Sequence, residues 1–180
     1  MRFEQMQLKG AWIVDPVPAE DERGWFARTF CVREFADLGL ETRFVQHSTS
    51  LSRRARTLRG LHFQEEPHGE VKIVSCGQGA IFDVIVDMRP GSPTRMRWTA
   101  VELSARNGRR LYIPKGFAHG FITLSDNVIV NYLISEFYEP SAARGLRYDD
   151  PVLAIEWPCQ PAVISERDLA WPYLEPEGLI

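Results

Sequence analysis

The chain has 180 residues, of which 44% are hydrophobic and 25% are charged, and its formal net charge at pH 7 is −3. A chain of this length can bury one sizeable core, and its weak negative charge excludes a global basic field that would recruit nucleic acid or an anionic membrane. The N-terminus lacks the apolar segment of a signal peptide, and no apolar run approaches the roughly 20 residues that span a bilayer. We therefore expect neither a nucleic-acid partner nor a membrane partner.

The three cysteines bear on the redox state of the compartment in which the protein works. Cys31, Cys76 and Cys159 are an odd number and lack the spacing of a metal site. Such cysteines are typical of reduced thiols. We expect a cytoplasmic protein.

The first part of the chain contains one predicted helix among short strands. The predicted elements are a strand at 11–14, a loop at 15–24, a strand at 25–30 and a helix at 32–40. Proline and glycine mark the loop, because proline restricts φ and glycine tolerates positive φ. An apolar side and a glycine near its end mark the helix.

From residue 43 onward the pattern is that of short strands separated by turns. Strands are predicted at 44–50, 58–64, 70–76, 80–88, 98–103, 111–113, 117–124 and 128–137. Gly77 to Gly79 connects two of them as a hairpin, and Ser165 is predicted to cap a short helical turn near the C-terminus. Strands this short and frequent favour an all-β sandwich or barrel over βαβ units, and residues 1–180 are predicted to form a single domain.

The stretch 58–64, Leu-Arg-Gly-Leu-His-Phe-Gln, is the strongest candidate for a site. It places Arg59, His62 and Gln64 among leucine and phenylalanine, which is typical of a strand lining a polar cavity. A partly buried histidine bonded to a backbone carbonyl is the structural alternative. Side chains alternate across a strand, so Arg59 and His62 lie on opposite parities. They can share one cavity only if Gly60 permits a bulge or twist.

Two other predicted strands carry polar groups on faces that would otherwise be apolar. Lys72 shares its face with Val74, and Tyr132 shares its face with Val130. Burying an unpaired ammonium costs several kcal/mol, so these faces are not a plain core.

The side chains available limit the possible chemistry. His62, His68, Glu70 and His119 are conceivable metal ligands, but a tight His-x-His pair is missing and Gln64 stands in the place of the second histidine. No nucleophile elbow, dinucleotide fingerprint or P-loop is present. An imidazole, a phenol, an ammonium and carboxylates suit proton transfer at a carbon next to a carbonyl, which requires neither a metal nor a redox cofactor.

Several stretches resemble the nucleotide-sugar 4-keto-6-deoxyhexose epimerases, the family of dTDP-4-dehydrorhamnose 3,5-epimerase. The matching stretches are 21–26 (DERGWF), 58–64 (LRGLHFQ), 82–89 (FDVIVDMR), 92–94 (SPT), 113–121 (IPKGFAHGF) and 164–168 (ISERD). Their order and spacing cover nearly the whole chain.

This resemblance implies a cupin-type jelly roll without a metal, and a homodimer that exchanges strands and has active sites near the interface. It implies that His62 is the base, held by Asp168, that Tyr132 is the acid on the opposite face of the sugar, and that Lys72 stabilises the enolate. Sugar or diphosphate contacts would come from Arg59, His119 and Arg167. Nucleotide contacts would come from Arg23, Phe26, Gln46 and Tyr138, some of them from the partner subunit.

Two positions depart from the family pattern. Arg28 stands where the family usually has an acidic residue, and Ser48 stands where asparagine is usual. Arginine only donates hydrogen bonds, so Arg28 cannot accept one from a thymine N3–H. The nucleobase therefore stays open.

The resemblance predicts an enzyme, an isomerase that inverts C3 and C5 of dTDP-4-keto-6-deoxyglucose without a cofactor. Three alternatives stay open. They are a mono-epimerase acting on a related nucleotide sugar, a non-catalytic barrel that binds sugar nucleotides, and a metal-dependent cupin.

Overall fold

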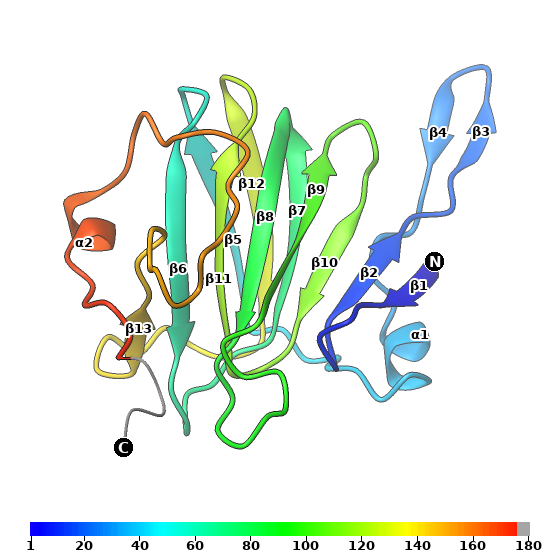
Figure 1. The fold of residues 1–180 in the computed structure, drawn as a ribbon. Coiled ribbons are helices and arrows are strands. Elements are labelled where there is room, and N and C mark those ends of the chain that lie inside the picture. Colours follow the sequence, from blue (N-terminus) through cyan, green and yellow to red (C-terminus); the bar gives the residue numbers. More distant parts are fainter. Residues whose placement is uncertain (176–180) are drawn as a thin grey trace.

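The computed structural model describes residues 1–175, and in this range two antiparallel sheets pack face to face (Figure 1). One sheet has six strands in the order β1-β2-β10-β7-β12-β5, and the other has five in the order β13-β6-β11-β8-β9. A separate two-stranded hairpin is made of β3 and β4. The predicted all-β, cupin-type jelly roll with a few short helices is confirmed.

The strands and helices are short throughout. In chain order they are β1 (Arg2–Gln5), β2 (Trp12–Asp15), β3 (Ala19–Asp21), β4 (Gly24–Phe26), α1 (Val32–Ala36), β5 (Gln46–Ser52), β6 (Leu58–Gln64), β7 (Lys72–Gln78), β8 (Ala80–Asp87), β9 (Trp98–Ser104), β10 (Arg110–Ile113), β11 (Phe117–Thr123), β12 (Val128–Ile134), β13 (Ala143–Gly145) and α2 (Glu166–Leu169).

The main core lies between the two sheets, because alternate residues of each strand point inward. Val74 of β7 and Val130 of β12 meet Ile85 of β8 and Phe121 of β11 there, and all four are buried. Tyr132 packs against the same cluster from its predicted face. A second cluster covers the outer face of the six-stranded sheet, where Phe35 of α1 is fully buried.

The structure corrects several predicted boundaries. The predicted loop at 15–24 contains β3, which pairs with β4, and the strand predicted at 25–30 ends at Phe26. Phe30 packs its ring 4.9 Å from that of Phe35, so aromatic packing there replaces strand pairing. The helix predicted at 32–40 is shorter in the structure. It is α1, which ends at Ala36, and the chain then turns at Gly39, whose φ is 68°. The strand predicted to reach residue 137 ends at Ile134, and β13 was not predicted.

A bulge in β6 brings two predicted site residues to one side of the sheet. Across the β6–β11 pairing His62 is opposite His119 and Arg59 is opposite Phe121, so β6 has one residue more than β11 over this interval. Gly60 in the bulge has φ of 117°, and a Cβ there would lie 2.5 Å from the Cα of Gly120. Only glycine fits this position without a backbone shift.

The β3–β4 hairpin projects from the sandwich beyond β1 and β2, on the side away from β6 and β13 (Figure 1). Its side chains Trp25 and Phe26 are 62% and 78% exposed. We call residues 19–26 the arm. Within residues 1–175, none of the helices has the length and apolar character needed to cross a membrane.

Candidate active site

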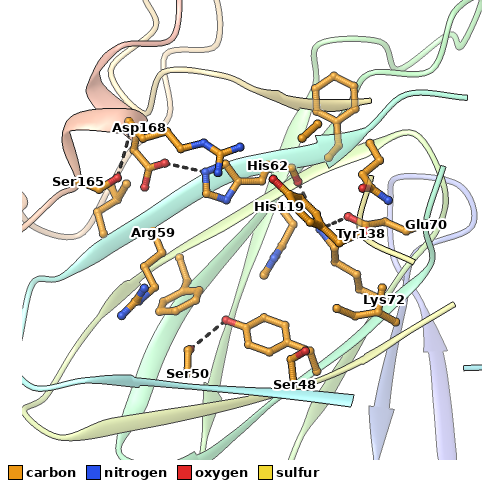
Figure 2. A pocket seen from close by; sticks show the side chains of 18 of the residues that line it. Ser48, Ser50, Arg59, His62, Glu70, Lys72, His119, Tyr138, Ser165 and Asp168 are labelled. Atoms are coloured by element: carbon orange, nitrogen blue, oxygen red, sulfur yellow. Dashed lines mark hydrogen bonds and ion pairs between the residues drawn. The ribbon is translucent and has the colours of Figure 1, made fainter. Parts of the chain in front are cut away.

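A cavity of about 690 Å³ opens between the two sheets at the β5–β6 side of the sandwich. Its volume lies in the usual range of roughly 300–1,000 Å³ for small-molecule sites. Nine of the eleven predicted site residues line it, namely Gln46, Arg59, His62, Lys72, His119, Tyr132, Tyr138, Arg167 and Asp168. Figure 2 shows Asp168 and Ser165 on one side of this cavity and Lys72 and Glu70 on the other.

His62 and Asp168 form a hydrogen-bonded pair at the rim. The Nε2 atom of His62 lies 2.6 Å from Oδ1 of Asp168 (Figure 2). Oδ2 of Asp168 accepts a hydrogen bond from the Gly60 N–H at 3.3 Å. Asp168 lies in the single turn of α2, which Ser165 caps by accepting from the Asp168 N–H at 3.1 Å. The predicted cap is thus confirmed, and it places Asp168 against the bulge in β6.

The surroundings of Asp168 keep it ionised. Partial burial by itself would raise the pKa of this carboxyl, but the His62 imidazole, followed by the Gly60 N–H and Ser165, holds the pKa below its ordinary value. A carboxylate only accepts hydrogen bonds, so Nε2 of His62 carries the proton that is donated. When the imidazole of His62 is neutral, its Nδ1 atom then keeps a lone pair that can take a proton.

A second histidine–aspartate pair lies deeper, between β11 and β8. Nε2 of His119 is 2.7 Å from Oδ1 of Asp83, and the two side chains are 6% and 0% exposed. Oδ2 of Asp83 has no hydrogen-bond partner among the described residues. Burial raises the pKa of the Asp83 carboxyl, and the His119 imidazole opposes this shift.

Lys72 places an ammonium group in the cavity. Its Nζ lies 2.7 Å from Oε1 of Glu70 and 3.5 Å from the backbone oxygen of His62. The Lys72 and Glu70 side chains are 12% and 11% exposed, so the carboxylate offsets the cost of desolvating the cation. The prediction that this face is not a plain core is confirmed.

Tyr132 enters the cavity from β12, in the sheet opposite His62. Its hydroxyl lies 3.2 Å from Oγ of Ser50, and its ring centroid lies 6.4 Å from that of His119. Burial raises the pKa of Tyr132 to about 12, although the hydrogen bond with Ser50 lowers it. Tyr132 is therefore a neutral phenol, able to donate a proton, at any physiological pH.

The remaining predicted residues lie at the mouth of the cavity. Nε of Arg59 donates to Ser52 at 3.1 Å, which fixes the guanidinium against β5. The side-chain oxygen of Gln46 accepts from the Tyr138 N–H at 3.0 Å, so these two predicted nucleotide contacts are adjacent. Arg167 lies 5.9 Å from the ring of Trp171 as a cation–π contact.

Arg23 and Phe26 do not line the cavity of their own chain. Both lie in the arm, where the Arg23 side chain is 85% exposed and pairs with Asp21. Arg28 follows the arm and contacts Glu34 at 3.4 Å. Ser48, the other departure from the family pattern, does line the cavity.

The structure adds three groups that were not predicted as site residues: Ser50 and Glu70, which line the cavity, and Asp83, which lies behind it and bonds to His119. Asp83 carried a signal, because it is a carboxylate within the apolar strand β8. Ser50 had no comparable signal in the sequence. Within residues 1–175, no three His, Cys, Asp or Glu side chains converge as a metal site would require. Gln64 instead ties two loops together by donating to the backbone oxygens of His68 and Phe137.

Comparison with known proteins identifies the family. A family model described as dTDP-4-dehydrorhamnose 3,5-epimerase matches residues 5–176. The protein of that name from Methanothermobacter thermautotrophicus is 48% identical over 174 residues, which cover 94% of this chain and 92% of the relative.

Solved structures agree with this match. A Bacillus anthracis dTDP-4-dehydrorhamnose 3,5-epimerase with TDP and PPi bound gives a TM-score of 0.93 at 40% identity, covering 96% of this chain and 99% of that chain. A Legionella pneumophila dTDP-6-deoxy-D-glucose-3,5-epimerase in complex with dTDP-4-keto-L-rhamnose gives a TM-score of 0.90 at 39% identity, covering 96% of this chain and 92% of that chain. The chain belongs to the dTDP-4-dehydrorhamnose 3,5-epimerase family.

Proposed function

We propose that this protein inverts C3 and C5 of dTDP-4-keto-6-deoxyglucose, next to the C4 ketone, and so forms dTDP-4-keto-L-rhamnose. The observation that carries the proposal is the entry of His62 and Tyr132 into one cavity from opposite sheets. Inversion at carbon needs a base on one face of the sugar ring and an acid on the other.

Each polar group of the cavity has a role in this reaction. Nδ1 of His62 removes the proton, while Asp168 holds the imidazole in the required tautomer. The Lys72 ammonium stabilises the negative charge that develops on the ketone oxygen. Tyr132 gives its proton to the carbon from the opposite face. The same base serves both carbons if the ring turns between the two steps.

The proposed identity of the substrate is supported by the ligands bound in related structures and by the charges at the cavity mouth. The Bacillus anthracis structure contains TDP, and the Legionella pneumophila structure contains dTDP-4-keto-L-rhamnose. Arg59 and Arg167 at the mouth supply the cations that a diphosphate requires, and His119 lies beside the sugar position. Acid, base and cation all come from the chain, so the reaction needs no resident cofactor.

The test is hydrogen exchange during turnover. The purified protein is given dTDP-4-keto-6-deoxyglucose in D₂O, and the products are read by NMR and mass spectrometry. We expect deuterium at both C3 and C5, with inversion of both centres. Exchange at neither carbon would remove the proposed activity, and exchange at one carbon would make the protein a mono-epimerase.

The same proposal includes a homodimer with shared active sites. The arm exposes Trp25 and Phe26, and β5 is an edge strand beside the cavity, paired with β12 on one side and with no strand of the described residues on the other. An exposed edge accepts strands from a second chain through its free N–H and C=O groups. The arm of one subunit, added at β5 of its partner, brings Arg23 and Phe26 to the nucleotide beside Gln46 and Tyr138.

Subunit complementation tests this arrangement. Arg23→Ala/Phe26→Ala and His62→Ala are each prepared as poorly active dimers, mixed under conditions that exchange subunits, and assayed. If the arm acts on the partner, each mixed dimer contains one site with both defects and one intact site, and activity returns. Activity that stays at the level of the parents, or a monomer by light scattering, would contradict the shared site.

Two general properties complete the proposal. The chain forms one cupin-like domain, of which residues 176–180 lie outside the described residues, and the protein works in the cytoplasm. The free thiols of Cys31, Cys76 and Cys159 support a reducing compartment.

A further inference from the structure

The acid of the proposed reaction, Tyr132, must be reprotonated after each inversion. Each inversion consumes the phenolic proton of Tyr132, which must be replaced before the next turnover. Burial raises the pKa of the Tyr132 hydroxyl to about 12, so a tyrosinate left in the cavity is unfavourable and takes up a proton readily. Tyr132 itself packs against the main core.

Ser50 is placed to supply that proton. Among the described residues, Oγ of Ser50 is the one hydrogen-bond partner of the Tyr132 hydroxyl, at 3.2 Å. Ser50 is partly exposed, and it lines the cavity from β5, so the cavity connects its hydroxyl to solvent. A serine hydroxyl both donates and accepts hydrogen bonds. It is therefore a bridge between a buried phenol and the solvent.

We propose that Ser50 is a positioning and proton-relay residue that reloads the Tyr132 hydroxyl from solvent in each inversion. This inference rests on the proposed epimerase function. Figure 2 shows Ser50 on the strand below the cavity, with its hydroxyl aimed into it.

The proton balance closes over one inversion. The C–H bond to the sugar carbon breaks as Nδ1 of His62 takes the proton, and the electron pair moves into the enolate. A new C–H bond then forms with the Tyr132 proton. Ser50 gives its proton to the resulting phenolate and takes one from water, and the hydroxide left is neutralised by the proton that His62 releases. His62 is open to solvent for this release, since its side chain is 42% exposed.

The experiment compares exchange with inversion. In D₂O, the proton that His62 has taken exchanges for deuterium. If Tyr132 does not protonate the enolate first, His62 returns this deuterium to the original face, which labels the substrate without inverting it. For Ser50→Ala we expect the ratio of labelled, uninverted substrate to inverted product to rise about tenfold, less than the 10²–10⁴-fold effect of removing an acid outright. Ser50→Thr keeps the hydroxyl and should restore the wild-type ratio.

A matched control lies one residue away. The Thr49 hydroxyl donates to Oδ1 of Asn131 at 2.9 Å, so it also bridges β5 and β12, but on the face away from the cavity. Thr49→Ala should leave the ratio unchanged. In a Tyr132→Phe background, Ser50→Ala should add nothing, because the relay then has no acid to reload.

The outcomes separate the two proposals. A wild-type ratio in Ser50→Ala, or an equal rise in Thr49→Ala, overturns the relay while leaving the epimerase intact. An additive effect of Ser50→Ala in the Tyr132→Phe background overturns it as well. No exchange by the wild-type protein overturns both proposals. Circular dichroism and melting temperature confirm that each variant is folded.

Discussion

The two histidine–aspartate pairs of this protein use the same groups in different surroundings. His62 and His119 are opposite each other in the pairing of β6 with β11, and each bonds a carboxylate through Nε2. The His62 side chain is 42% exposed, whereas that of His119 is 6% exposed. Only the exposed imidazole can pass protons to and from the solvent.

The two carboxylates also differ in their surroundings, in the number of hydrogen bonds they accept and in the direction of their pKa shifts. Asp168 has hydrogen bonds to both oxygens, from His62 and Gly60, and these hold its pKa low. Asp83 bonds through one oxygen only, and burial raises its pKa. Solvent access and the number of donors, more than the residue types, therefore distinguish the pair proposed to transfer protons from the pair proposed to orient a substrate contact.

The largest expected effect separates the two histidines. His62→Ala should lower kcat by about 10²–10⁴-fold with KM little changed, because the base is lost. His119→Ala should act mainly on KM, because a substrate contact is lost. Steady-state kinetics of both variants measures the contrast. Equal losses of kcat would show that exposure does not distinguish the two pairs.

The next effect separates the two carboxylates. Asp168→Asn should lower kcat by about 10–10³-fold, because an amide can donate to Nε2 and release the required tautomer. Asp83→Asn is the matched control and should change kcat by less than about tenfold, since His62 and not His119 is the proposed base. A larger loss in Asp83→Asn would reverse the assignment of the two pairs.

The bulge that presents His62 can be tested through stability. Gly60→Ala combines positive φ with a Cβ 2.5 Å from the Cα of Gly120, and we expect a loss of about 2–4 kcal/mol in the free energy of unfolding. Gly39→Ala also has positive φ, but its Cβ meets nothing within 4 Å, so the loss should be about 1–2 kcal/mol. Urea unfolding measures both. Equal losses would mean that the close approach of β6 to β11 is unimportant.

The smallest effect concerns the pH dependence of stability. The pKa of Asp168 is lowered by folding, so its contribution is present above the unfolded pKa and is lost as the pH falls through the folded pKa. The pKa of Asp83 is raised, so its ionisation destabilises the fold as the pH rises through the folded value. As the pH rises from 4, the free energy of unfolding of Asp83→Asn should therefore increase relative to that of the wild type. That of Asp168→Asn should decrease relative to the wild type. Urea unfolding at several pH values checks the opposite signs.

Much of the fold was predictable because strand patterns are local. The alternation in β7 and β12 correctly placed Lys72 and Tyr132 on inward faces. Boundaries failed where packing outweighed the local pattern, as at Phe30, which joins an aromatic cluster instead of a strand. Ser50 was missed because one serine in an edge strand has no distinctive spacing.

The sequence by itself determined the all-β class, the inward residues of most strands and, through its motifs, the family. Only the tertiary structure decided which partners meet, because these contacts join positions far apart in the chain. His62 and Asp168 are 106 residues apart, and Ser50 and Tyr132 are 82 apart. The bulge at Gly60 was likewise undecided by alternation, since one extra residue reverses the parity of every side chain beyond it.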